Sequence, residues 1–183
     1  MRQSSNIYNI SLLASLIAHE GQAAAKKWTR SVVGNFARKP QSNDSGQIEA
    51  VAAGICDMSL VNSYYLARYA RSDDAAKTDI FNKLGIIFPN QGGRGTHINI
   101  SGAAVTANAP NRANAIKFIE YLTSESAQSY FANGNNEYPI IDLGADTSAI
   151  QSLGTFKEDS LSVEALGENQ AQAIAIYDAA GWQ

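Results

Sequence analysis

Short apolar runs alternate with helical stretches along this chain, and this alternation restricts the fold more than any other feature. Residues 58–61 are a short, mainly apolar run of the kind that forms a buried parallel strand. Asn62 and Ser63 follow directly and are typical of a helix N-terminus. Further strands are predicted at residues 86–88, 97–100 and 103–106. Strands that alternate with helices indicate an α/β fold with largely parallel sheets.

The spacing of apolar residues predicts the helices. A first helix is expected over 8–19, with Asn6 or Ser5 as its cap, and a second over 23–36 after a break at Gly21. Four apolar residues of the second helix should face inward: Trp28, Val32, Val33 and Phe36. Shorter helices are expected at 48–53, 72–77, 125–132 and 163–180, and one that begins after a turn at 108–111. Residues 39–46 and 90–95 are predicted loops.

Charge and hydropathy exclude two classes of partner. The 183 residues carry a net charge of -3, and the 14 Lys and Arg are scattered, so nucleic acid is not an expected partner. No apolar stretch approaches the roughly 20 residues that a bilayer span needs, so no direct membrane insertion is expected. Met1 is followed by a polar stretch without the basic and apolar regions of a signal peptide, which alone predicts the cytosol.

Catalytic motifs are weak in this sequence. The loop NQGGRGT at 90–96 is rich in glycine but lacks the lysine and spacing of a phosphate-binding loop. The two histidines, His19 and His97, lie far apart in the sequence, and His19 is predicted at a helix end, where an imidazolium suits the helix dipole. A hydrolase that uses His19 and Glu20 is the most distant of the functional alternatives, and we expect no enzyme.

Two adjacent tyrosines, Tyr64 and Tyr65, fall in the first turn of the helix predicted after residue 61. Adjacent helical residues point about 100° apart, so the two cannot both belong to one core stripe. A trivalent cation displaces the phenol proton, and the amides of a helix N-terminus favour negative charge, so the pair suits a hard ion such as Fe³⁺. One half-buried tyrosine with a hydrated hydroxyl group, beside a neighbour at the surface, is the simpler interpretation of these two residues taken alone.

The sequence resembles the ferric-ion-binding periplasmic proteins of bacterial iron ABC transporters, nearest the branch that uses several tyrosines. The resemblance runs through the whole chain in order. Its main segments are SSNIYNISLLASLIAHEG at 4–21, NFARKP at 35–40, AVAAGICD at 50–57, NSYYLAR at 62–68, GTHINISGAAVT at 95–106 and NNEYP at 135–139.

This resemblance implies a set of metal ligands. The Tyr-Tyr pair of the family matches Tyr64 and Tyr65, and a third ligand tyrosine matches Tyr8. Asn6 and Asn62, which lie two positions before Tyr8 and Tyr64, are expected to support the tyrosines without touching the ion. The implied cargo is Fe³⁺, held together with an anion such as carbonate. The family's remaining ligands and its anion-binding arginine have no counterpart in this chain.

The resemblance also implies a fold and a role. Family members are type II periplasmic binding proteins, which are bilobal clamps, and this chain corresponds to an incomplete, C-terminal portion. Residues 1–90 would form most of the second lobe, and 91–183 would return through the hinge to the first lobe. The implied protein is periplasmic, with its export signal in the missing part, and delivers iron to an inner-membrane permease. The alternative is the same clamp with another ligand, such as thiamine or an organophosphonate.

Overall fold

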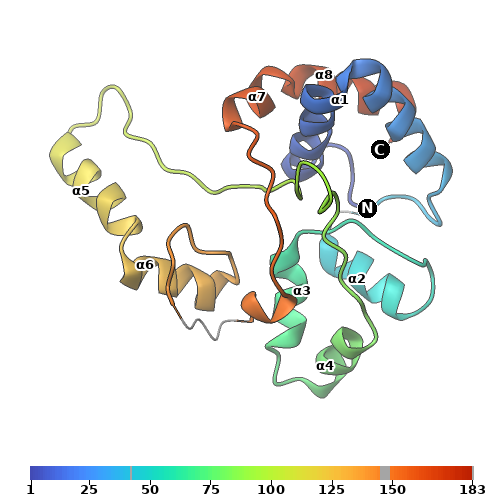
Figure 1. Cartoon of the computed structure of the whole chain (residues 1–183), viewed down its shortest axis with the longest axis horizontal. Helices are drawn as coiled ribbons and strands as arrows, with labels where there is room; N and C mark the ends of the chain where they lie inside the picture. The colour runs from blue at the N-terminus through green and yellow to red at the C-terminus, as the bar shows by residue number, and fades with distance from the viewer. Residues whose placement is uncertain (42, 145–148, 183) are drawn as a thin grey trace. The chain divides into compact units, whose positions relative to one another are not determined.

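The computed structural model of the protein describes residues 1–41, 43–144 and 149–182 (Figure 1). The chain forms two compact units that interleave along the sequence. Unit 1 comprises Met1–Val61, Lys83–Asn99 and Phe156–Gln183, and unit 2 comprises Asn62–Asn82 and Ile100–Thr155. The predicted lobe boundary near residue 90 concerns a longer clamp and stays a prediction.

Unit 1 is built on α1 (Ile7–Gly34), which is two helical segments joined at a break. The break lies at Gly21, whose φ of 78° and ψ of 166° are non-helical and suit a residue without a Cβ. Asn6 caps the first segment by accepting a hydrogen bond from the Tyr8 amide at 3.0 Å. The predicted pair of helices, the break and the cap are therefore confirmed.

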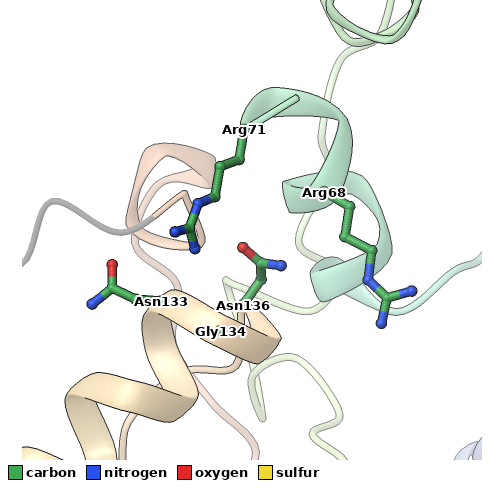
Figure 2. A pocket seen from close by; sticks show the side chains of 5 residues that line it. All are labelled: Arg68, Arg71, Asn133, Gly134 and Asn136. Carbon is green, nitrogen blue, oxygen red and sulfur yellow. The ribbon is translucent and has the colours of Figure 1, made fainter. Parts of the chain in front are cut away.

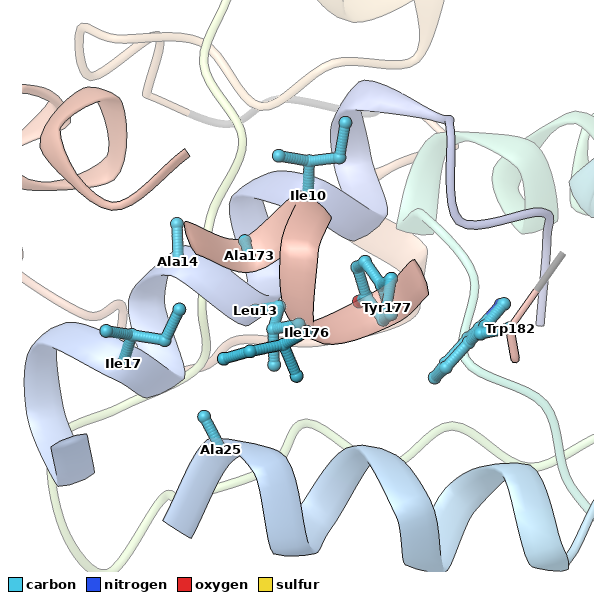
Figure 3. Close-up of a cluster of buried hydrophobic side chains, with 9 residues drawn as sticks. All are labelled: Ile10, Leu13, Ala14, Ile17, Ala25, Ala173, Ile176, Tyr177 and Trp182. Carbon is cyan, nitrogen blue, oxygen red and sulfur yellow. The ribbon is translucent and has the colours of Figure 1, made fainter. Parts of the chain in front are cut away.

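The core of unit 1 lies between α1 and the C-terminal helices α7 (Val163–Glu168) and α8 (Gln170–Ala180) (Figure 3). Two hydrogen bonds connect this core to the first residues of the chain. The Tyr177 hydroxyl donates to the Asn9 carbonyl at 2.8 Å, and the Trp182 indole donates to the Arg2 carbonyl at 2.9 Å. The side chains predicted to face inward from the second segment of α1 do pack against this core: Trp28, Val32, Val33 and Phe36.

The helix α2 (Asp44–Ala52) begins four residues before the predicted helix at 48–53. The predicted loop at 39–46 is too long because Asn43 acts as a cap, accepting a hydrogen bond from the Gly46 amide at 2.7 Å. Residue 42 of that predicted loop lies outside the described residues. The acidic side chain of Asp44 in the first turn further favours a helix start at this point.

Unit 2 contains the helix that carries the tyrosine pair, α3 (Ser63–Ala70), as predicted. Its other helices are α4 (Ala75–Asn82), α5 (Arg112–Leu122), α6 (Glu125–Tyr130), a π-helical turn at Phe131–Asn135 and a 3₁₀ turn at Gln151–Leu153. The helix predicted over 125–132 therefore changes to a π-turn after Tyr130. In unit 1, the helix predicted over 163–180 is divided at Asn169 into α7 and α8.

The four predicted strands are wrong for the described residues. Residues 58–61, 86–88, 97–100 and 103–106 are irregular, and the described backbone pairs only in two isolated parallel bridges, Arg2 with Gln41 and Thr96 with Glu158. A strand needs a neighbour that satisfies its backbone groups, and these segments find none in the described residues. Their apolar side chains are exposed accordingly, at 76% for Met58 and 85% for Ile87.

No described helix is both long and apolar enough to cross a membrane.

Candidate metal centre

The tyrosine pair lies in the first turn of α3, in unit 2. The rings of Tyr64 and Tyr65 have their centroids 4.3 Å apart, with 32° between their planes, and both residues are half-buried. The two side chains have therefore turned toward each other from positions that diverge by about 100° on the helix. The pair forms one compact phenol cluster rather than one packed ring and one solvated ring.

Arg68 completes this cluster one turn further along α3. Its guanidinium carbon lies 5.5 Å from the Tyr64 ring centroid and 4.9 Å from that of Tyr65. Residues three and four positions apart share a helix face, and a guanidinium within about 6 Å of a ring is attracted to it. The i+3 and i+4 spacing from the two tyrosines is visible in the sequence, but Arg68 was not among the predicted site residues.

The residue before the helix, Asn62, occupies the cap position but makes no capping hydrogen bond with its side chain. Its carbonyl accepts a hydrogen bond from the Tyr65 amide at 3.2 Å and so starts the helical turn that carries both phenols.

Tyr8 occupies the equivalent place in unit 1, in the first turn of α1. It is half-buried, and the Arg2 guanidinium carbon lies 5.9 Å from its ring centroid. The structure thus brings Tyr64 and Tyr65 together, whereas Tyr8 belongs to the other unit and is described there.

The other five tyrosines are in settings that suit metal binding less well. Burial raises the pKa of Tyr138 to about 12 and raises that of Tyr177 as well, so both phenols resist ionisation. Tyr69 is only 5% exposed, whereas Tyr121 and Tyr130 are open to solvent at 54% and 71%.

Ordinary metal ligands do not cluster in the described parts of the chain. No group of three or more His, Cys, Asp or Glu side chains lies close enough to hold an ion there. A phenol loses its proton to a trivalent cation, and the resulting phenolate is a hard oxygen ligand.

Both histidines lie in unit 1 and make side-chain contacts within it. The His19 imidazole pairs with the Asp159 carboxylate at 2.7 Å, whereas Glu20 pairs with Arg94 at 2.6 Å. His19 and Glu20 thus have different partners and do not form the pair on which the hydrolase alternative depends.

His97 lies 2.9 Å from the Ser11 hydroxyl, a contact between residues 86 positions apart that the sequence analysis missed. Burial lowers the pKa of His97, so the imidazole is kept neutral. The Ser11–His97 contact ties the segment around residue 97 to α1.

Comparison with known proteins bears on this arrangement. Residues 5–158 match the family described as "Bacterial extracellular solute-binding protein". The chain is 48% identical to "Iron uptake protein A2" of Synechocystis over 185 residues, which cover 100% of this chain and 54% of that protein. The chain therefore spans about half the length of the curated relatives it matches.

Two solved structures share the fold closely. A Trichodesmium FutA (IdiA) in complex with iron and citrate ligands matches with a TM-score of 0.94 and 51% identity, covering 100% of this chain and 58% of that one. The ferric binding protein from Campylobacter jejuni matches with a TM-score of 0.92 and 39% identity over the same shares. This chain therefore has the fold of part of a bilobal binding protein.

Proposed function

Because this chain belongs to the bacterial extracellular solute-binding protein family, we propose that it is part of a carrier that binds ferric iron through tyrosine phenolates. The observation that carries the proposal is the close pair of Tyr64 and Tyr65, with ring centroids 4.3 Å apart and planes tilted by 32° at the start of α3. The iron proteins that the chain resembles support the same cargo.

Tyr64 and Tyr65 would supply two phenolate oxygens to Fe³⁺, and Tyr8 is the proposed third ligand on the strength of the sequence resemblance. Asn6 and Asn62 would act indirectly, by fixing the helical turns that carry these tyrosines. An anion such as carbonate would occupy remaining coordination positions. Protons compete with the metal for phenolate, so affinity should fall as the pH is lowered.

The role would be transport without catalysis. A carrier of this kind makes and breaks no covalent bond of a substrate; it needs hard oxygen ligands and a surface for its permease. The proposed location is the periplasm, and the proposed recipient is an inner-membrane ABC permease. In the complete clamp, residues 1–90 would belong mostly to the second lobe and 91–183 to the hinge return and the first lobe. Thiamine and organophosphonates are less well supported as cargo because the relatives named above are iron proteins.

Adding Fe³⁺ as its nitrilotriacetate complex tests the proposal directly. Phenolate bound to ferric iron produces a visible charge-transfer band, so the chain should become coloured at neutral pH. The double variant Tyr64→Phe/Tyr65→Phe should lose this band. The matched control is Tyr121→Phe/Tyr130→Phe, which removes two exposed phenols from the same unit and should keep it. A double variant of the pair that keeps the full band would refute the assignment.

A further inference from the structure

Unit 2 contains a hollow of about 360 Å³ between the end of α3 and the π-turn at Phe131–Asn135. Among the described residues, its lining is polar and includes no acidic side chain: Arg68, Arg71, Asn133, Gly134 and Asn136. The volume is at the lower end of the range for small-molecule sites, and a lining of this kind suits an anion with hydrogen-bonding groups.

Asn136 is the unusual member of this lining. The residue is only 5% exposed, and its side-chain oxygen is buried with no hydrogen-bond partner among the described residues. Figure 2 shows the amide of Asn136 directed into the space between α3 and the π-turn. A buried acceptor without a donor costs free energy, and such a group in a native fold calls for an unseen partner.

The positive charge of the hollow comes mainly from Arg71. This residue caps the C-terminal end of α3, and its guanidinium extends toward Asn133 and Asn136 (Figure 2). The guanidinium of Arg68 points away from these two residues and lies against the tyrosine rings instead. Arg71 therefore offers a planar set of donors, the geometry that binds carboxylate in a bidentate manner.

We propose that this hollow binds a small 2-hydroxycarboxylate. The carboxylate would pair with the Arg71 guanidinium, and the neighbouring hydroxyl would donate to the unpartnered oxygen of Asn136. An anion without a hydrogen-bond donor would pair with Arg71 but would leave the side-chain oxygen of Asn136 without a donor. The hollow also has more room than phosphate requires. The inference goes beyond the proposed role in iron binding, because none of its steps uses a metal.

Calorimetric titration of the 183-residue chain in metal-free buffer tests the proposal with two probes of equal charge. Malate carries the hydroxyl and succinate lacks it, so malate should bind about tenfold more tightly, the effect of one hydrogen bond to a buried acceptor. Absence of saturable binding at millimolar malate would overturn the proposal, and so would equal affinity for the two acids. Tighter binding of inorganic phosphate than of malate would overturn the assignment of ligand class.

Variants separate the two contacts. Asn136→Gly removes the acceptor but tolerates the left-handed backbone at φ 59°, so it should bind malate no better than succinate. Arg71→Met should weaken both acids about tenfold or more, whereas Arg112→Met, which removes a charge outside the hollow, should weaken neither. A preference for malate that survives Asn136→Gly would contradict the proposed contact, as would unchanged affinity in Arg71→Met. Circular dichroism of each variant checks that it is folded.

Discussion

Gly95 is the glycine of this chain that tolerates a side chain least. A Cβ at this position would lie 2.4 Å from the carbonyl oxygen of Glu158 and 2.8 Å from that of Lys157. Both obstacles are backbone atoms, so no side-chain rotation can relieve the contact. The φ of 100° adds strain for any residue other than glycine. Gly95→Ala should therefore force the two segments of unit 1 apart.

The cost follows from the contacts that would be lost. Separation breaks two backbone hydrogen bonds, from the Thr96 amide to the Lys157 carbonyl at 2.8 Å and from the Asp159 amide to the Thr96 carbonyl at 2.9 Å. At about 1 kcal/mol for each bond and about 1 kcal/mol for the positive φ, Gly95→Ala should lose about 3 kcal/mol of unfolding free energy. For a chain of this length the expected fall in Tm is about 6–12 °C.

Tryptophan fluorescence is a specific readout for this change. Both tryptophans of the chain, Trp28 and Trp182, belong to the core of unit 1, so their emission follows the unfolding of that unit. The control is Gly93→Ala in the same loop, where the nearest atom to the new Cβ would be 3.9 Å away. If the melting curves of Gly95→Ala and Gly93→Ala coincide within a degree or two, the argument from close backbone approach is refuted.

Three further predictions concern stability. Leu13→Ala, at a fully buried position, should cost about 3 kcal/mol in urea unfolding, whereas Ile174→Ala, at a position 40% exposed, should cost clearly less. Because burial lowers the pKa of His97, this histidine takes up its proton at a higher pH in the unfolded chain than in the folded one. The unfolding free energy should therefore fall as the pH drops below about 6.5. Urea titrations at several pH values should show a weaker dependence of unfolding free energy on pH for His97→Gln. Because burial raises the pKa of Tyr138 to about 12, this phenol ionises at a lower pH in the unfolded chain than in the folded one. The unfolding free energy should therefore fall as the pH rises from about 10 to 12. In alkaline unfolding experiments, Tyr138→Phe should lack the part of this fall that comes from Tyr138.

Local chemistry allowed much of the helical structure to be predicted. Asn6 caps α1, and Gly21 interrupts it, because a side-chain acceptor and a missing Cβ act over a few residues. The strand predictions failed for the opposite reason. Residues 58–61 and 86–88 have the composition of buried strands, but a strand also needs a distant partner, and local composition cannot reveal whether one is present.

Some features of the candidate site could likewise be predicted from the sequence, and others could not. Tyr64 and Tyr65 could be placed in a first helical turn from the sequence because the preceding Asn62 and Ser63 mark a helix start. The 4.3 Å approach of their rings depends on side-chain rotamers, which the sequence does not determine. The side-chain oxygen of Asn136 is buried without a partner among the described residues, and burial is a property of the folded chain that no sequence pattern indicated.

The most direct test of the account is to count the phenols that ionise when iron binds. Ultraviolet difference spectra, recorded as Fe³⁺ is added at neutral pH, report the conversion of phenol to phenolate. The account predicts ionisation of three tyrosines, reduced to two in Tyr8→Phe and lost in large part in Tyr64→Phe/Tyr65→Phe. Iron binding by the unaltered chain without phenol ionisation would contradict the claim that tyrosines hold the metal.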